Sequence, residues 1–462
     1  MYDGGVLAGL NVGRVAASAA YPIIWRHGDV HNQTRNPIDL EAPRGTRLQR
    51  TLRAFHNYNF RLFWFGQLIS QIGTWMQSVA QAWLVLQIAH SPVALGTVTA
   101  LQFLPILCGS LFASVLTDRI PKRKLLLVTQ SLALTQAAVL ALLAGSGHIQ
   151  LWHLYALALF LGCVTALDAP TRQSFVVELV GRENVVNAVG LNSAIMSSAR
   201  LFGPALGGVV IAAWGTSVCF TVNAISFLAV LISLVLMRPA EFQAVAPRSR
   251  PAGRMASELA EGLRFVFRDA ELAGIVIAVA GLGTFGFNYA TMIPLLASDA
   301  LHLGPQGFGL LSAGVGVGAL ASALGMAGSE RPTYRRILLA AVSFGILQLA
   351  TGFAYWFALA FVLVAAFAAC GSLFSMSANS TLQLRTPDEL RGRVMGLYTM
   401  LSMGATPVGA LLTGALASAV GIRLTMVTWG SLCLLAVLAG YLCSQRLRGR
   451  AQAEHQALAA FG

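Results

Sequence analysis

The residues best suited to bind a polar ligand form a stripe on one apolar stretch early in the chain. Gln67, Gln71, Thr74, Ser78 and Gln81 follow one another at intervals of four, three, four and three. At 100° per residue these positions fall within an arc of about 80° on a helix. Amides and hydroxyls offer hydrogen bonds that lipid tails cannot return. The stripe therefore predicts either a path for a polar ligand or hydrogen bonds to neighbouring helices.

Two later apolar stretches carry shorter polar stripes with the same two interpretations. Their members are Thr284, Asn288 and Thr291 in one stretch, and Ser372, Ser375 and Asn379 in the other. Trp75 and Phe285 lie close in sequence to these stripes and offer rings on which an aromatic or amphipathic ligand could stack. Ordinary helix packing is the alternative for each ring.

Two charged residues are candidates for a role in transport or in structure. Arg200 lies well inside an apolar stretch, where a charge costs at least ~2.5–3.5 kcal/mol. Because arginine stays protonated, it could hold an anionic group but could not carry a proton. Hydrogen bonds to carbonyls of a neighbouring helix are the alternative. Asp168, at the end of another apolar stretch, is a candidate coupling group or the partner of Arg172 in an ion pair.

The stretch around Arg200 also combines glycines with a proline. Gly203, Pro204, Gly207 and Gly208 follow within eight residues of Arg200. Proline removes a backbone donor that lipid cannot replace, so protein must cover this segment. Small residues let a second helix come close. The pattern predicts a packing seam between two moving parts.

Composition places these residues in a membrane. The chain has 462 residues, of which 56% are hydrophobic and 11% charged, against about 25% charged in soluble proteins. The net charge of +13 does not indicate a nucleic-acid partner, because the basic residues fall in alternate connections and in the two tails. The six cysteines have no CxxC spacing, so neither a metal site nor another cofactor is expected.

The apolar runs predict an all-α polytopic protein with twelve membrane-spanning helices. The expected ranges are 61–89, 93–116, 125–145, 149–169, 185–213, 216–237, 272–297, 306–327, 337–354, 356–378, 394–417 and 421–443. Connections rich in Lys and Arg alternate with short turns that have none. The positive-inside rule therefore places both termini in the cytoplasm.

The hydrophilic segments divide the chain into five parts. We expect a disordered cytoplasmic tail over 1–55, a six-helix bundle over 56–237, and a cytoplasmic linker over 238–271 with an amphipathic helix at Ser257–Arg268. A second six-helix bundle follows over 272–443, and a basic cytoplasmic tail over 444–462. The sequence ELVGR that begins at Glu178 returns as ELRGR at Glu389, a shift of 211 residues (389 − 178). This repeat favours the duplicated architecture of secondary transporters.

The connection after the second helix resembles a motif of the major facilitator superfamily. SVLTDRIPKRK, from Ser114 to Lys124, is similar to G-x-x-x-D-R-x-G-R-[RK], with Asp118 and Arg119 at the matching positions. The resemblance implies that this pair stabilises the state closed to the cytoplasm and that helices 1, 4, 7 and 10 line a central cavity. A purely topological role for the neighbouring cations is the alternative.

The fifth helix resembles a second motif, G-x8-G-x3-G-P-x2-G-G, which marks exporters of the superfamily and chiefly proton antiporters. Gly190, Gly203, Pro204, Gly207 and Gly208 match at their spacing. Together with DAPTRQSFVVELV and LRGRVMGLY, the chain is similar to the bacterial branch that exports siderophores. GVGVG at Gly314–Gly318 is not a nucleotide loop, because no strand precedes it and no Lys follows. Its expected role is packing against the fifth helix.

Together these observations predict a monomeric exporter of the bacterial inner membrane. It would move a small amphipathic siderophore, drug or metabolite outward by alternating access, with protons as the counter-substrate that the resemblance implies. A nutrient importer of the same fold and a non-transporting membrane receptor or scaffold are the alternatives. The lipid bilayer is its other partner, and no enzymatic activity is expected.

Overall fold

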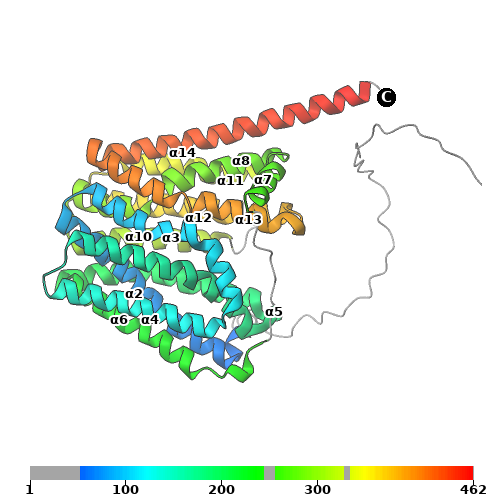
Figure 1. Ribbon diagram of the computed structural model, residues 1–462. Helices are drawn as coiled ribbons and strands as arrows, with labels where there is room; N and C mark the ends of the chain where they lie inside the picture. The colour runs from blue at the N-terminus through cyan, green and yellow to red at the C-terminus, as the bar shows by residue number, and fades with distance from the viewer. Residues whose placement is uncertain (1–52, 244–254, 327–332, 461–462) are drawn as a thin grey trace, which may run out of the picture. The chain divides into compact units, whose positions relative to one another are not determined.

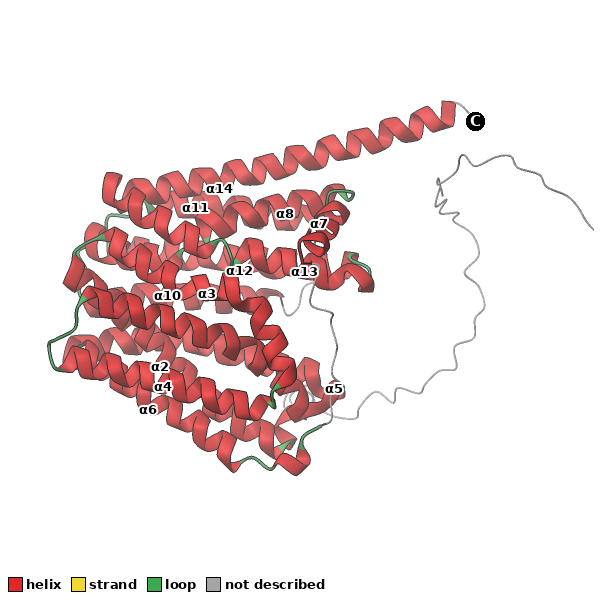
Figure 2. Ribbon diagram, in the orientation of Figure 1, coloured by secondary structure: helices red, strands yellow, loops and turns green. Residues whose placement is uncertain are grey.

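The computed structural model describes residues 53–243, 255–326 and 333–460. All regular secondary structure in these ranges is helical (Figure 2). The predicted all-α architecture is therefore confirmed. Long apolar helices arise here because a chain in lipid must satisfy every backbone hydrogen bond within itself.

The first half contains six membrane-length segments. A 3₁₀ helix, Arg53–His56, precedes α2 (Tyr58–Ala89), α3 (Pro92–Arg119), α4 (Lys122–Gly145), α5 (Leu151–Trp214) and α6 (Thr216–Leu236). The backbone of Gly181 has a φ of 72°, which breaks α5 into Leu151–Gly181 and Glu183–Trp214. A left-handed φ of this kind costs glycine little.

The second half follows a short 3₁₀ turn, Pro239–Glu241, and the linker helix α7. Its elements are α7 (Met255–Val266), α8 (Ala270–Gly281), α9 (Tyr289–Leu295), α10 (Pro305–Met326), α11 (Tyr334–Thr351), α12 (Phe357–Arg385), α13 (Asp388–Ser402) and α14 (Thr406–Ala460). The π-helical stretch Leu282–Gly286 connects α8 to α9, and a second one, Leu296–Ala300, continues α9, so that Ala270–Ala300 forms one interrupted span. Gly421, with a φ of 83°, breaks α14 into two segments.

Eight helices of the described chain are long and apolar enough to cross a membrane. The breaks at Gly181 and Gly421 separate helices that run together in α5 and α14. With α8 and α9 taken as one span, and α13 with the first part of α14 as another, the segments match the twelve predicted ranges. Most helical ends differ from the predicted ones by a few residues, but the fourth helix continues from residue 169 to Gly181 and the tenth from residue 378 to Arg385.

The turns reveal the duplication more clearly than the sequence does. His90 and His302 are the only non-glycine residues of the described chain with positive φ, at 47° and 51°. They follow the first helix of each half. Gly215 and Gly421, with φ of 84° and 83°, precede the last helix of each half. We call the helix ends that carry these turns the His90 end and the opposite ends the linker end.

A buried polar network also recurs in the two halves. In the first half, Gln77 donates to Gln136 (3.0 Å) and Asn223 donates to Gln77 (2.8 Å). In the second half, Gln348 donates to the carbonyl of Phe285 (3.3 Å), and the Cys433 thiol contacts Gln348. Each network ties the first, third and sixth helices of its half. Buried amides that are satisfied in this way fix the packing of a bundle.

The halves meet along two helix pairs, α5 with α10 and α3 with α14. In Figure 1, α3 and α10 lie in the middle of the bundle, with α8, α11 and α14 on one side and α2, α4 and α6 on the other. A Cβ on Gly208 would lie 2.9 Å from the Cα of Gly309, and a Cβ on Gly96 would lie 3.3 Å from the Cα of Gly414. Both crossings lie toward the His90 end. Glycine is needed there because any side chain would separate the helices.

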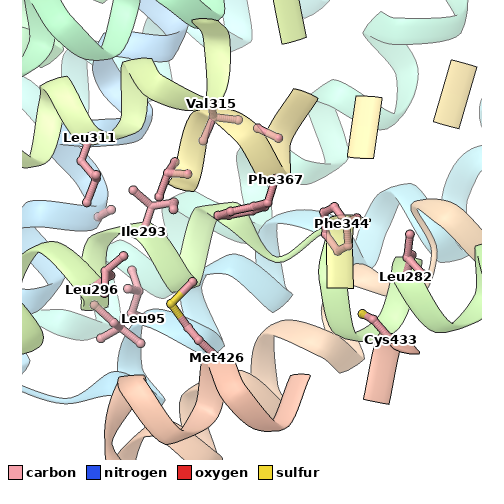
Figure 3. Packing of buried hydrophobic residues seen from close by; sticks show 14 of the residues in the cluster. Leu95, Leu282, Ile293, Leu296, Leu311, Val315, Phe344, Phe367, Met426 and Cys433 are labelled. Atoms are coloured by element: carbon pink, nitrogen blue, oxygen red, sulfur yellow. The ribbon is translucent and has the colours of Figure 1, made fainter. Parts of the chain in front are cut away.

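Apolar side chains from both halves fill the space beside these crossings. Leu95 of α3 belongs to the same buried cluster as Ile293 of α9 and Leu311 of α10 (Figure 3). The Trp83 ring stacks on Phe308 with centroids 5.9 Å apart. The His90 end is thus closed by packing between the two halves.

Three segment boundaries differ from those expected. Residues 53–55, assigned to the N-terminal tail, are ordered, and the backbone N–H of Ala54 donates to Asn187 (2.9 Å). The predicted C-terminal tail continues α14 as a helix to Ala460. The amphipathic linker helix begins at Met255 rather than Ser257 and ends at Val266. The remaining N-terminal residues lie outside the described ranges.

Candidate functional site

A cavity of about 400 Å³ lies between the two halves. Its described lining comes from α2, α3, the second part of α5, the interrupted seventh span, α10, α12, α13 and α14. None of these lining residues comes from the Leu151–Gly181 segment, so the expectation that the fourth helix lines the cavity is wrong for this structure. The second, fifth, eighth and eleventh spans contribute instead, because they form the contact between the halves. In the labels of Figure 1 these spans are α3, the second part of α5, α10, and α13 with the start of α14.

Arg200 lines this cavity from near the middle of the Glu183–Trp214 segment. Its guanidinium carbon lies 5.2 Å from the centre of the Trp75 ring, within the range of a cation–π interaction. Tyr289 of the opposite half lines the same cavity. Among the described residues it has no hydrogen-bond or ion-pair partner. The alternative of bonds to carbonyls across the seam is therefore not seen.

The polar stripe of α2 faces the cavity only in part. Trp75 and Ser78 line the cavity, whereas Gln67, Gln71 and Gln81 do not. The cavity face of α2 also includes Val79 and Ala82, and at 100° per residue its centre is turned by about 70° from the centre of the stripe. Two of the three amides of the stripe, those of Gln67 and Gln81, are buried inside the first bundle.

The interrupted seventh span presents Asn288 and Tyr289 to the cavity. The side-chain amide of Asn288 donates to the carbonyl of Thr284 (2.7 Å), and its Oδ1 is buried with no partner among the described residues. Thr284 does not line the cavity. Its hydroxyl donates to the carbonyl of Ala280 in the same span. Thr291 lies 3.4 Å from the hydroxyl of Thr99 in the first half.

Of the polar residues predicted on α12, which is the tenth membrane span, only two line the cavity. Ser372 and Ser375 line the cavity, and the Ser375 hydroxyl lies 2.8 Å from that of Tyr398. Asn379 does not line it and accepts a hydrogen bond from Gln383 (2.6 Å). Phe285 also points elsewhere and packs on Trp429, with ring centroids 5.2 Å apart.

Asp168 is buried inside the first bundle, away from the cavity. It accepts hydrogen bonds from Thr129 and Gln130, both at 2.8 Å, and pairs with Arg172. The ion pair that sequence offered as the alternative is therefore present. The Asp168 carboxylate thus connects the Leu151–Gly181 segment of α5 to α4. These contacts explain its burial without a ligand.

The predicted gating residues form two groups, the pair Asp118 and Arg119 at the end of α3 and the glycine motif of α5. The side chains of Asp118 and Arg119 lie outside the described part of the chain. Their neighbours hold α4 in place: Lys122 pairs with Glu178 (2.7 Å), and Arg123 donates to the carbonyl of Leu234 (2.7 Å). These contacts tie the linker ends of three helices together.

The glycine motif serves two interfaces. A Cβ on Gly203 would lie 2.5 Å from the Cβ of Trp75, and one on Gly207 would lie 3.3 Å from the backbone of Met76. Both glycines therefore pack on α2 in their own half. Gly208 faces α10 of the other half, and Pro204 lines the cavity between these contacts.

The three glycines of GVGVG in α10 also contact two different helices. Gly316 packs on Leu201 of α5, as expected. Gly314 and Gly318 pack on α12 instead.

Sequence reasoning missed several cavity residues, chiefly aromatic ones. They are Phe103, Phe287, Tyr289, Phe308 and Tyr398. Phe287 and Tyr289 flank Asn288 of the predicted polar stripe, so their place beside this residue was the signal that could have found them. Tyr398 lies in the LRGRVMGLY stretch, whose apolar pattern is no different from that of a lipid-facing turn.

Comparison with known proteins agrees with this architecture. The family described as Transmembrane secretion effector matches residues 50–461. The Staphyloferrin A transporter of Staphylococcus aureus is 25% identical over 84% of this chain and 97% of its own length. The multidrug efflux pump Tap of Mycolicibacterium fortuitum is 26% identical over 82% of this chain and 95% of its own. The enterobactin exporter EntS of Citrobacter koseri is 25% identical over 77% and 85%.

Solved structures share the fold. The POT family transporter PepTSo aligns with a TM-score of 0.66 at 12% identity, covering 85% of this chain and 98% of its own. A bacterial homologue of the human lysosomal transporter Spinster aligns with a TM-score of 0.64 at 13% identity, covering 88% and 99%. At these identities the likeness concerns the fold alone. With the match over residues 50–461, this multi-pass membrane chain belongs to the transmembrane secretion effector family of major facilitator transporters.

Proposed function

We propose that this protein exports small amphipathic molecules by alternating access. The observation that carries the proposal is a cavity bounded by both halves and closed by packing at one end only. At the His90 end, Gly208 and Gly96 meet the other half. Toward the linker end, a Cβ on Gly190 or Gly396 would have no atom of another described segment within 4 Å. Rocking of the halves would exchange the closed and the open ends.

The lining of the cavity supports an amphipathic substrate. Aromatic rings from both halves surround a few polar groups, which is the usual character of a site for a small organic molecule. Relatives are named for the export of siderophores and drugs, and we extend that range, with metabolites, to this chain. The cavity is complete within one chain, so a monomer suffices.

The orientation in the bacterial cytoplasmic membrane follows from charge. Arginines and lysines gather in the connections at the linker end, which the positive-inside rule assigns to the cytoplasm. Both termini would then be cytoplasmic, and the structure would represent the state open to the cytoplasm.

The energy source requires a separate argument. Proton antiport, expected from the resemblance, needs a side chain that binds and releases a proton. The described residues that line the cavity include no Asp, Glu or His. Asp168 remains the candidate acid, and its hydrogen bonds to Thr129 and Gln130 favour a structural role.

Asp168→Asn tests this role. We expect the variant to unfold at a lower temperature, because Arg172 loses its partner. Breaking a fully buried ion pair costs about 3–5 kcal/mol. The cost here is smaller, since the Arg172 side chain reaches solvent. Transport per folded molecule should be retained with unchanged dependence on pH gradient. Asp299→Asn, at an exposed carboxylate, is the control. A well-folded variant that transports but no longer responds to a proton gradient would instead identify Asp168 as the coupling group.

The proposed export is tested with everted membrane vesicles. Vesicles that contain the protein should accumulate an ethidium-like dye or a labelled siderophore in energised conditions, and vesicles without the protein should not. An importer of the same fold would move substrate in the reverse direction. A receptor or scaffold would bind without accumulation.

A further inference from the structure

The cavity carries one uncompensated positive charge. Among the described lining residues, Arg200 is the only charged side chain. Its partner Trp75 is neutral and holds the guanidinium by its ring face. A charge kept at bilayer depth normally has a functional reason, because its burial is costly. The N–H donors of Arg200 are therefore available to a ligand.

The groups opposite Arg200 are also suited to an anion with an apolar body. Tyr289 and Ser375 offer hydroxyls from the second half, whereas the Tyr398 hydroxyl donates to the carbonyl of Ser375 (3.1 Å) and lies 2.8 Å from the Ser375 hydroxyl. Hydroxyls and guanidinium N–H groups donate hydrogen bonds to carboxylate or sulfonate oxygens. Phe103 and Phe308 supply apolar walls. A cation would meet the field of Arg200 with no acid to offset it.

We infer that the cavity selects an amphipathic monoanion, held by Arg200, and that the membrane potential drives its export. This inference rests on the proposed function. An anion that leaves a cell with a negative interior moves down the electrical gradient. One elementary charge across about 100 mV corresponds to a concentration ratio of about 50-fold. Export of this kind needs no titrating acid, which agrees with the lack of one among the described cavity residues.

The test uses two probes with one scaffold and opposite charges, dansylglycine and dansylcadaverine. The full chain is reconstituted in liposomes, and a potassium gradient with valinomycin makes the lumen positive at equal pH on both sides. Dansylglycine should accumulate in the lumen, up to about 50-fold at about 100 mV, and dansylcadaverine should not accumulate when the sign of the potential is reversed. With potassium equal on both sides, valinomycin holds the potential at zero, and an imposed pH gradient should then drive no accumulation.

Charge reversal at the site provides the matched variant. Arg200→Glu should lose dansylglycine transport by at least ~10-fold and gain transport of dansylcadaverine, which at the same time shows that the variant folds. Arg200→Lys should retain the preference for the anion with weaker binding, because it keeps the charge and loses the planar fork. Arg446→Glu, an exposed residue of α14 outside the cavity, is the control for charge reversal and should behave like the unmodified protein.

The possible failures are distinct. If the protein transports dansylcadaverine as well as dansylglycine, or Arg200→Glu leaves the preference unchanged, export stands and selection of anions is overturned. If only the pH gradient drives dansylglycine, the inference about the membrane potential is overturned. If neither probe nor the dye and siderophore of the vesicle assay moves under any gradient, the proposed function itself fails.

Discussion

Replacing Gly208 with leucine is expected to reduce transport at least ~10-fold and to shift the protein away from the state described here. A Cβ at this position would lie 2.6 Å from the carbonyl oxygen of Pro305 and 2.9 Å from the Cα of Gly309. These are backbone atoms that cannot rotate away. Overpacking of this kind costs about 1–3 kcal/mol, enough to change the ratio of two states about 5- to 150-fold.

Gly190 allows the same idea to be tested in the opposite direction. It lies 18 residues before Gly208 on the uninterrupted Glu183–Trp214 helix, which is five full turns, so both glycines share one face. Among the described residues, no atom of another helix lies within 4 Å of a Cβ on Gly190. If the halves rock, this position comes into contact in the alternate state. Gly190→Leu should therefore stabilise the present state while it also blocks transport.

A single reporter cysteine distinguishes the two effects. Ser375 lines the cavity, and Ser375→Cys in a background without the six native cysteines can be labelled by an impermeant maleimide from either side of the membrane. Gly208→Leu should lower labelling from the linker side, and Gly190→Leu should preserve or raise it. Gly449→Leu, which also has open space around it, is the control. Equal shifts in the same direction, or full activity of Gly190→Leu, would exclude this seam from alternation.

Arg423→Gln is expected to destabilise the second half by several kcal/mol. The Arg423 guanidinium donates to the carbonyls of Gly352 (3.2 Å), Ala354 (2.6 Å) and Ala300 (3.1 Å). It also lies 4.4 Å from the centre of the Tyr355 ring. These carbonyls end the seventh span and form the turn after α11. Each one left without a donor costs about 1–3 kcal/mol where water cannot replace it.

The measurement is the unfolding temperature of the purified protein in detergent. Arg423→Lys should fall between the unmodified protein and Arg423→Gln, because an ammonium group cannot reach three carbonyls with the geometry of a fork. Arg391→Gln is the matched control, since its partner Asp388 is 80% exposed and exposed ion pairs contribute about 0–1 kcal/mol. An unfolding temperature equal to that of this control would contradict a structural role for Arg423.

The sequence was sufficient for the number and order of the helices, because lipid imposes a simple rule. Each span must be long, apolar and internally hydrogen-bonded, and these properties are local. The rule could not find the π-helical breaks around Asn288 or the helical continuation of α14 to Ala460. The breaks depend on which neighbouring helices cover the backbone, and this is not visible in the sequence. The positive φ of His90 and His302 could not be predicted either, since a histidine does not by itself indicate a left-handed turn.

For the cavity, sequence by itself determined which residues do not face lipid, and tertiary structure decided what they face. Arg200, Trp75, Ser78 and Asn288 line the cavity, whereas Gln67 and Asp168 turn inward to their own bundle. A polar side chain in a membrane is stabilised by a neighbouring helix as well as by a ligand path, and the two have the same periodicity. Only the rotation of each helix about its own axis separates them. That rotation is set by contacts such as Gly203 on Trp75 and Gly208 on Gly309, between residues far apart in the chain.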